Sequence, residues 1–243
     1  MHFLKKAVAT TALLALSFTA SGQQLIQNGG FESGDFTGWT ATNQGTGSCA
    51  TDWTVGTSGS ATGCTSVADP FEGDFAAYNS FDGAGPLEYR LSQTVSLPSG
   101  ITSAELAWVQ SYALSIFSGA SPRTFNVLIT DADDATVHGT VSSQSFSGSE
   151  SSGGEWEQFN EDVTSVLEPL GGSTVNVVFV NVIPESFTGP AGFGLDAVSL
   201  TVEATPPAPV EPTAIPSLSS LGILLLALIM AGIAYGRFGS RHS

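Results

Sequence analysis

The feature that most constrains this chain lies between positions 23 and 203, where short β-prone runs alternate with clusters of Gly, Ser, Asp and Pro. The run 174–183 is almost entirely β-branched or apolar, which is typical of a strand buried on both faces. The runs 125–130 and 136–141 flank the polar segment Asp-Ala-Asp-Asp-Ala, which indicates a hairpin. No sustained helical period appears here beyond one short turn, so we predict an all-β sandwich or barrel.

Charge limits the partners of this region. The chain of 243 residues has a formal net charge of −16, with only six lysines and arginines. Four of these lie near the two ends, so residues 23–203 include only Arg90 and Arg123. Such a surface repels a phosphate backbone and attracts metal cations, so we expect no nucleic-acid partner.

The first 22 residues have the pattern of an export signal. Two lysines precede the apolar stretch 7–16, and Ala-Ser-Gly follows at 20–22. This order predicts a secretory signal peptide, residues 1–22, cut after Gly22. An N-terminal membrane anchor is the alternative, but it would need a longer apolar span.

Export would place the two cysteines of the chain in an oxidising compartment. An oxidising compartment favours a disulfide between Cys49 and Cys64. A bridge across so short a loop would contribute about 3 kcal/mol in the chain-entropy description. Metal binding by the two thiols, without a nearby histidine, is the alternative.

The C-terminal part divides into a proline-rich linker, residues 204–214, and the segment 215–243. Residues 218–235 carry no charge and would span about 27 Å as a helix, close to the ~30 Å hydrocarbon core of a bilayer. Arg237 and Arg241 follow, and basic residues after a span belong in the cytoplasm. We therefore predict one transmembrane helix with the bulk of the chain outside. A buried core helix would explain neither the prolines nor the arginines.

The start of this segment reads Ile215-Pro216-Ser217-Leu218. With the apolar stretch and the basic tail, it resembles the IPTL-CTERM sorting signals of Gram-negative bacteria, relatives of the PEP-CTERM signals. The resemblance implies an exosortase-type membrane enzyme as a partner. The helix would anchor the protein transiently in the inner membrane and be removed on its way to the cell surface or extracellular matrix. A permanent single-pass anchor is the alternative.

An acidic residue stands at the start of the last predicted strand. Asp196 has the same parity as Val198, Leu200 and Val202, so we expect it on the core side. A carboxylate there costs several kcal/mol unless it is paired, and the domain offers only two arginines. A Ca²⁺ ion, which accepts about 6–8 oxygen ligands, would solve this problem. The alternative is that Asp196 caps a turn.

Four segments in order resemble landmarks of known domains. Leu-Ile-Gln-Asn-Gly-Gly-Phe-Glu at 25–32, with Phe-Thr-Gly-Trp at 36–39, resembles the opening of galactose-binding-like jelly rolls and family 4/9/22-type carbohydrate-binding modules. The segments 72–78, 156–164 and 193–200 are similar to the later landmarks. The resemblance implies a jelly-roll β-sandwich over residues 23–203.

In those families a structural calcium ion ties the first strand to the last. The resemblance places its ligands on Glu32 and Asp196, with further oxygens from the loop at Gly73 and Asp74.

Catalytic motifs are scarce. His138 is the single histidine of the domain, and the sequence has no Gly-x-Ser-x-Gly elbow, zinc-binding His pair or phosphate loop. Glu155 and Glu157 would project from one side of a strand about 6.6 Å apart, with Glu161 further along, against the roughly 5–5.5 Å of a retaining glycosidase. An acidic solvated strand explains this row equally well. We therefore expect no enzyme, and a glycosidase is the third interpretation.

Glycan binding is a second class of function, because modules of the resembled fold stack aromatic rings on sugars. The candidate rings are Trp53, Trp108, Tyr112 and Phe117. The alternative for Trp108 is core packing, since it shares parity with Leu106.

The sequence as a whole predicts an exported, calcium-stabilised protein of the surface or matrix of a Gram-negative bacterium. Its role would be binding or structural rather than catalytic. The alternative is a carbohydrate-binding module with a specific glycan or exopolysaccharide ligand.

Overall fold

A computed structural model describes residues 22–42, 51–62, 65–83, 85–147, 151–205 and 220–239. The chain forms two compact units, residues 1–206 and 207–243. The predicted signal peptide, Cys49, Cys64 and the motif Ile215-Pro216-Ser217-Leu218 lie outside the described residues, apart from Gly22 at the cleavage point.

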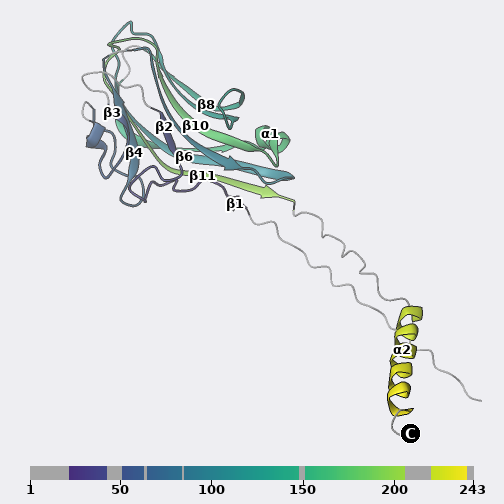
Figure 1. The fold of residues 1–243 in the computed structure, drawn as a ribbon. Helices are drawn as coiled ribbons and strands as arrows, with labels where there is room; N and C mark the ends of the chain where they lie inside the picture. Colours follow the sequence, from purple (N-terminus) through teal and green to yellow (C-terminus); the bar gives the residue numbers. More distant parts are fainter. Residues whose placement is uncertain are drawn as a thin grey trace, which may run out of the picture. The chain divides into compact units, whose positions relative to one another are not determined.

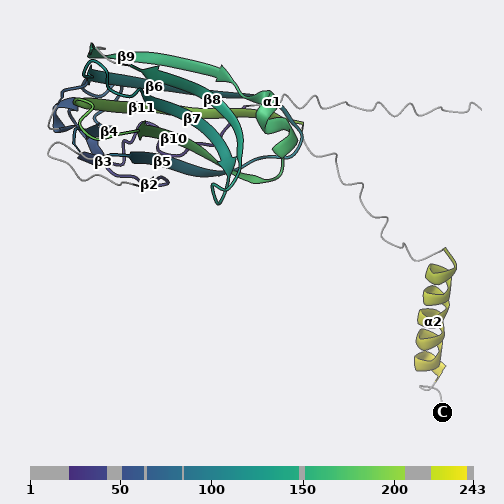
Figure 2. The same cartoon turned by 90° about the horizontal axis from the view of Figure 1, so that it is seen from above.

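The first unit is a β-sandwich of two antiparallel sheets (Figures 1 and 2). The six-stranded sheet has the order β3-β4-β11-β6-β9, with β1 paired to β11. The five-stranded sheet has the order β2-β5-β10-β7-β8. The strands are β1 (Gln23–Gln24), β2 (Thr40–Thr42), β3 (Thr51–Gly56), β4 (Ala76–Phe81), β5 (Leu87–Ser96), β6 (Ile101–Ser115), β7 (Arg123–Asp131), β8 (Val137–Phe146), β9 (Ser151–Asp162), β10 (Thr174–Ile183) and β11 (Ala191–Ala204).

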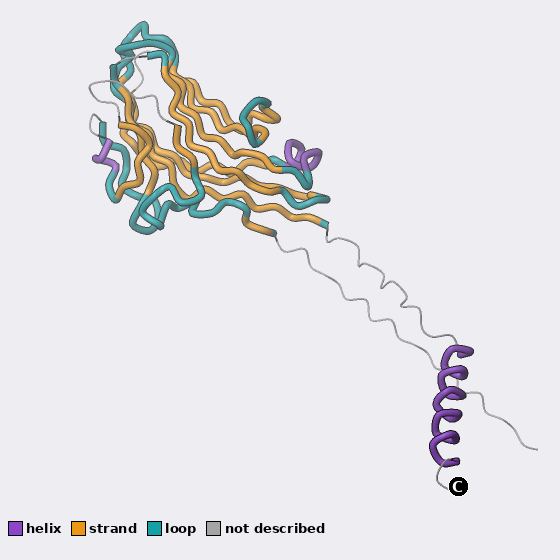
Figure 3. Tube along the Cα trace, viewed as in Figure 1, coloured by secondary structure: helices purple, strands orange, loops and turns teal. Residues whose placement is uncertain are grey.

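Short helical turns and loops connect the strands (Figure 3). They are η1 (Gly59–Thr62), α1 (Thr164–Leu167) and η2 (Glu168–Leu170). The all-β prediction is confirmed, as are two of its details. The apolar run 174–183 is β10, hydrogen-bonded between β5 and β7. The hairpin is β7–β8, and the backbone N–H of Asp131 donates to the carbonyl of Thr136 across its turn.

Aromatic residues fill the space between the sheets. Phe179 on β10 lies 6.1 Å from Trp39 and 6.0 Å from Trp108, centroid to centroid. Phe125 stacks on Phe193 of the opposite sheet at 6.0 Å. These rings come from alternate positions of their strands, since a strand turns every second side chain to the same face. Their burial supplies much of the hydrophobic stabilisation of the sandwich.

The second unit contains the helix α2 (Ser220–Gly239), so the helical conformation predicted for 218–235 is present over most of that range. In the part of the chain that the structure describes, no helix has both the length and the apolarity needed to cross a membrane. This finding does not support the predicted transmembrane segment.

Candidate functional site

A hollow of about 440 Å³ opens on the outer face of the six-stranded sheet. Its floor comes from β6, one wall from β9, and the other from the loop that precedes β4. We call it the Phe71 groove, and its lining includes Phe71, Ala107, Val109, Gln158, Asn160 and Ala197.

One aromatic ring, that of Phe71, lines one end of this groove. The ring of Phe71 is 41% exposed, and it meets Trp156 edge to face with centroids 6.2 Å apart. Trp156 is fixed, because its indole N–H donates to the carbonyl of Asp69 at 2.8 Å and its ring packs on the buried Tyr78 and Ala113. The exposed ring of Phe71, which lines the groove, therefore packs against Trp156, which is held in place outside the lining.

Amide side chains supply the polar part of the groove. Gln158 and Asn160 are exposed on β9 and stand two residues apart, on the same face as Trp156. Each amide offers two N–H donors and a carbonyl acceptor. Ala107 and Val109 leave the floor between them shallow and apolar.

Two carboxylates hold the loop that carries Phe71. Asp196 Oδ2 accepts hydrogen bonds from the backbone N–H groups of Phe71 at 2.9 Å and Glu72 at 3.2 Å. Glu32 accepts from the N–H groups of Asp74 at 3.1 Å and Phe75 at 3.0 Å. The loop thus depends on one acid after the first strand and another in the last.

Gly73 allows this close approach. Its φ is +62°, and a Cβ built there would lie 2.3 Å from Cδ of Glu32. Only glycine fits such a position without displacing the carboxylate.

The expected orientation of Asp196 is wrong. Asp196 pairs with Val109 on the outer face of the sheet, and a register shift separates it from Ser199. Ala197, with φ +49°, lies in this bulge, so Leu195 and Val198 both reach the core. A bulge adds one residue and reverses the parity of everything before it. Asp196 is nevertheless fully buried, because the loop at 71–75 covers it.

Burial is the main cause of the shifted pKa of Asp196. It raises the pKa of this carboxyl to about 6, although the N–H groups of Glu72, Ala197 and Phe71 oppose the shift by stabilising the charge. The negative charge of Glu72 raises the pKa further.

The structure brings together two of the three predicted calcium ligands. Glu32 and Asp196 hold the same loop, whereas Asp74 is exposed and contributes its backbone N–H. Glu72, which sequence reasoning missed, is exposed but directs its carboxylate toward Gly30. Its Oε1 and Asp196 Oδ1 lie 3.2 and 3.7 Å from the point that a Cβ on Gly30 would occupy.

These acids do not form a finished metal site as they stand. Among the described side chains, no group of three or more His, Cys, Asp or Glu is arranged to hold a metal ion. The oxygen chemistry of Glu32, Glu72 and Asp196 does suit a hard cation such as Ca²⁺.

Three of the four aromatic candidates for glycan stacking are core residues. Trp53, Trp108 and Tyr112 are 4%, 1% and 6% exposed. Trp108 stacks on Phe159 at 4.9 Å, which is the core packing that its shared parity with Leu106 allows. These buried rings offer no face to a ligand, so the prediction for them is corrected. Phe117, in contrast, is 55% exposed.

The row of acids on β9 points away from the groove. Glu157 pairs with Gln110, and Glu161 with Leu106, both on the inner face of β6. Glu155 and Glu157 are exposed, as is His138 on β8. The groove and the acidic row therefore occupy opposite faces of one strand.

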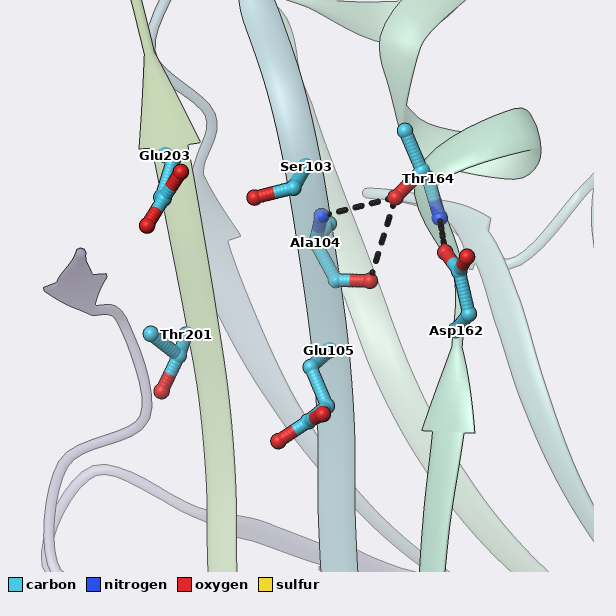
Figure 4. A pocket seen from close by; sticks show the side chains of 7 residues that line it. All are labelled: Ser103, Ala104, Glu105, Asp162, Thr164, Thr201 and Glu203. Carbon is cyan, nitrogen blue, oxygen red and sulfur yellow. Dashed lines mark hydrogen bonds between the residues drawn. The ribbon is translucent and has the colours of Figure 1, made fainter. Parts of the chain in front are cut away.

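A second hollow, of about 360 Å³, lies at the far end of β6, β9 and β11 (Figure 4). Its carboxylates are Glu105, Asp162 and Glu203. Asp162 accepts from the backbone N–H of Thr164 at 2.9 Å, and hydrogen bonds from Thr164 lower its pKa. Thr164 also accepts a hydrogen bond from the N–H of Ala104 at 2.8 Å. These contacts fasten the turn into α1, which gives Asp162 a structural role.

No protein-family model and no curated protein match the chain. Among solved structures, it is similar to TmCBM61 in complex with β-1,4-galactotriose, with 16% identity, a TM-score of 0.43, and coverage of 73% of this chain and 97% of that one. It is also similar to the CBM22-1 xylan-binding domain of Paenibacillus barcinonensis Xyn10C, with 15% identity, a TM-score of 0.40, and coverage of 78% and 100%. A third is the K3 cleaved adhesin domain of Lys-gingipain from Porphyromonas gingivalis, with 16% identity, a TM-score of 0.45, and coverage of 74% and 99%.

Proposed function

We propose that this chain is a non-catalytic carbohydrate-binding module that binds a neutral glycan in the Phe71 groove. One observation carries the proposal: a 41% exposed phenylalanine ring borders a hollow of about 440 Å³ that exposed amides also line. The C–H face of a sugar ring packs on an aromatic ring, and its hydroxyl groups need donors and acceptors. Phe71 supplies the first, and Gln158 and Asn160 supply the second.

Charge selects among glycans. The chain carries a net charge of −16, and Glu72 and Asp196 lie beside the groove. A negative potential of this kind repels uronic-acid or sulfated polysaccharides. The ligand class is therefore neutral, such as a glucan, xylan or galactan.

A glycan array tests this function. The 23–203 fragment, with its fold checked by circular dichroism, is applied to neutral and anionic oligosaccharides, including β-1,4-galactotriose and xylan fragments. We expect saturable binding to at least one neutral series and none to the anionic ones. A folded fragment with no saturable signal would contradict the proposal and favour a purely structural surface protein.

We propose that the same loop takes up a calcium ion. Glu32, Glu72 and Asp196 would supply carboxylate oxygens, with backbone carbonyls of the loop beside them. The support is the buried charge of Asp196, which no lysine or arginine neutralises among the described ion pairs. The bound ion would hold the loop at 71–75 against the sheet.

We propose that the domain works outside the cell, on the pattern of residues 1–22 and on the resemblance of residues 215–243 to signals handled by exosortase-type enzymes. Mass spectrometry of the protein from its native cells tests this. We expect an N-terminus at Gln23, a C-terminus near Leu218 and a bridge between Cys49 and Cys64. An intact chain with free thiols would contradict it.

A further inference from the structure

Two loops lie side by side at the end of the sandwich where β6 and β10 finish. The backbone N–H of Phe117 donates to the carbonyl of Thr188 at 3.0 Å, and that of Ser121 donates to Glu185 Oε1 at 2.7 Å. These loops carry the two most exposed phenylalanine rings that the structure describes, Phe187 at 70% and Phe117 at 55%.

The backbone of Phe187 is strained. Its φ is +53°, in the left-handed region that a bulky side chain rarely adopts. Such strain persists only where surrounding contacts enforce it, and it is concentrated at functional sites. An exposed ring on a strained backbone adds nothing to the hydrophobic core.

Hydrogen bonds hold the backbone of Phe187 and of the residues that follow it. The N–H of Phe187 donates to the carbonyl of Gly83 at 2.7 Å. Immediately after it, the buried guanidinium of Arg123 donates from Nε to Thr188 Oγ1 at 2.8 Å and from Nη2 to the carbonyl of Gly189. The ring of Phe81 lies 5.2 Å from this guanidinium, whose hydrogen bonds hold the backbone that follows Phe187.

We propose that Phe117 and Phe187 form a second ligand-binding surface, which packs on the apolar face of a neutral sugar. This inference rests on the proposed function for the class of ligand. Its residues, however, lie on other loops than the one that carries Phe71. The fixed backbone keeps both rings outward before the ligand arrives, so little ordering cost is paid on binding.

The surroundings of the rings favour a sugar over a lipid surface. Ser118, Gly119 and Ser186 are small exposed neighbours, and Glu185 adds a negative charge. Arg123 is buried and cannot meet a lipid phosphate. With a net charge of −16, the chain is repelled by an anionic bilayer.

The test compares four variants of the 23–203 fragment: Phe187→Gly with Phe117→Ala, Phe71→Ala, all three changes, and Val137→Ala. Val137 is 53% exposed on β8 and serves as the control. Affinity electrophoresis uses β-glucan, xylan and β-1,4-galactan as probes. We expect the loop variant to weaken binding about tenfold and the triple variant to abolish it. Because glycine relieves the positive φ at position 187 and Phe117 is exposed, the melting temperature of the loop variant should not fall.

The outcomes separate the two sites. Unchanged binding in the loop variant, with loss in Phe71→Ala, overturns this inference and leaves the groove standing. Loss of binding in the loop variant alone supports this inference and overturns the proposal that the Phe71 groove binds the glycan. Absence of binding to every probe by the unaltered fragment overturns both. Sedimentation with phosphatidylcholine vesicles that depends on Phe187 would overturn the sugar and identify a lipid surface.

Discussion

The carboxylate of Asp196 accepts a hydrogen bond from the backbone N–H of Phe71 at 2.9 Å, across 125 positions of the sequence. The last strand of the sandwich therefore holds the loop that carries the exposed ring of the groove. Because Glu32 holds the other end of this loop, the acids after the first strand and in the last strand act on one loop.

Replacement of Asp196 by alanine should destabilise the domain and weaken glycan binding together. The N–H groups of Phe71 and Glu72 would lose their acceptor, at a cost of about 1–3 kcal/mol. Urea denaturation and titration with the best glycan measure the two effects. A variant with lower stability but unchanged affinity would show that the loop does not position Phe71.

Calcium should stabilise the domain through the same loop. We expect the melting temperature of the 23–203 fragment to be higher in millimolar Ca²⁺ than in EGTA, because an ion that binds only the folded state adds about 2.7 kcal/mol at 100 times its Kd. In Asp196→Asn the rise should shrink or vanish, whereas Asp69→Asn serves as a nearby control. No rise in the unaltered fragment would leave backbone N–H groups as the only partners of the buried acid.

Gly73→Ala should cost more than an ordinary glycine replacement. Both Gly73 and Gly119 have a positive φ, but a Cβ on Gly73 would meet Glu32 at 2.3 Å, while one on Gly119 would meet nothing within 4 Å. Gly119→Ala measures the backbone strain alone, which is about 1 kcal/mol. We expect Gly73→Ala to lose at least about 2 kcal/mol in chemical denaturation. Equal losses would mean that Glu32 moves aside freely.

Stability should fall in acid partly through Asp134, at the tip of the β7–β8 hairpin. Partial burial opposes the shift, but hydrogen bonds from Thr130 and Asn176 and the charge of Arg90, 3.4 Å away, hold its pKa below 3.8. A folded pKa below the unfolded one gives stability that is present above pH 3.8 and lost as pH falls through the folded pKa. Asp134→Asn should therefore be less stable than the parent at pH 7, and the difference in stability should narrow as the pH falls below 3.8. A constant difference would contradict this.

The sequence predicts the fold better than the site. Alternating apolar residues and the run 174–183 are enough to specify strands, because each must bury one or both faces. The bulge at Ala197 could not be predicted in this way. Its one extra residue turns Asp196 to the opposite face of the sheet, and no residue type in the sequence indicates it. The burial of Asp196 was expected for the wrong reason, since a loop covers it rather than the core.

The aromatic residues show the same limit. Trp53, Trp108 and Tyr112 are large and β-prone, which suits a core as well as a binding face, and only their packing distinguishes the two. Phe71 stands two residues before Gly73, in a loop whose position depends on long-range hydrogen bonds to Asp196. A single sequence carries no local signal for that contact.

Glycan binding in the groove depends, in our proposal, on the ring of Phe71. Isothermal titration of the 23–203 fragment with the strongest neutral oligosaccharide from the array tests it most directly, using Phe71→Ala, Phe71→Trp and the control Val137→Ala. We expect about a tenfold weaker Kd for Phe71→Ala, equal to roughly 1.4 kcal/mol, and near-parental affinity for the other two variants. Parental affinity in a correctly folded Phe71→Ala would contradict it.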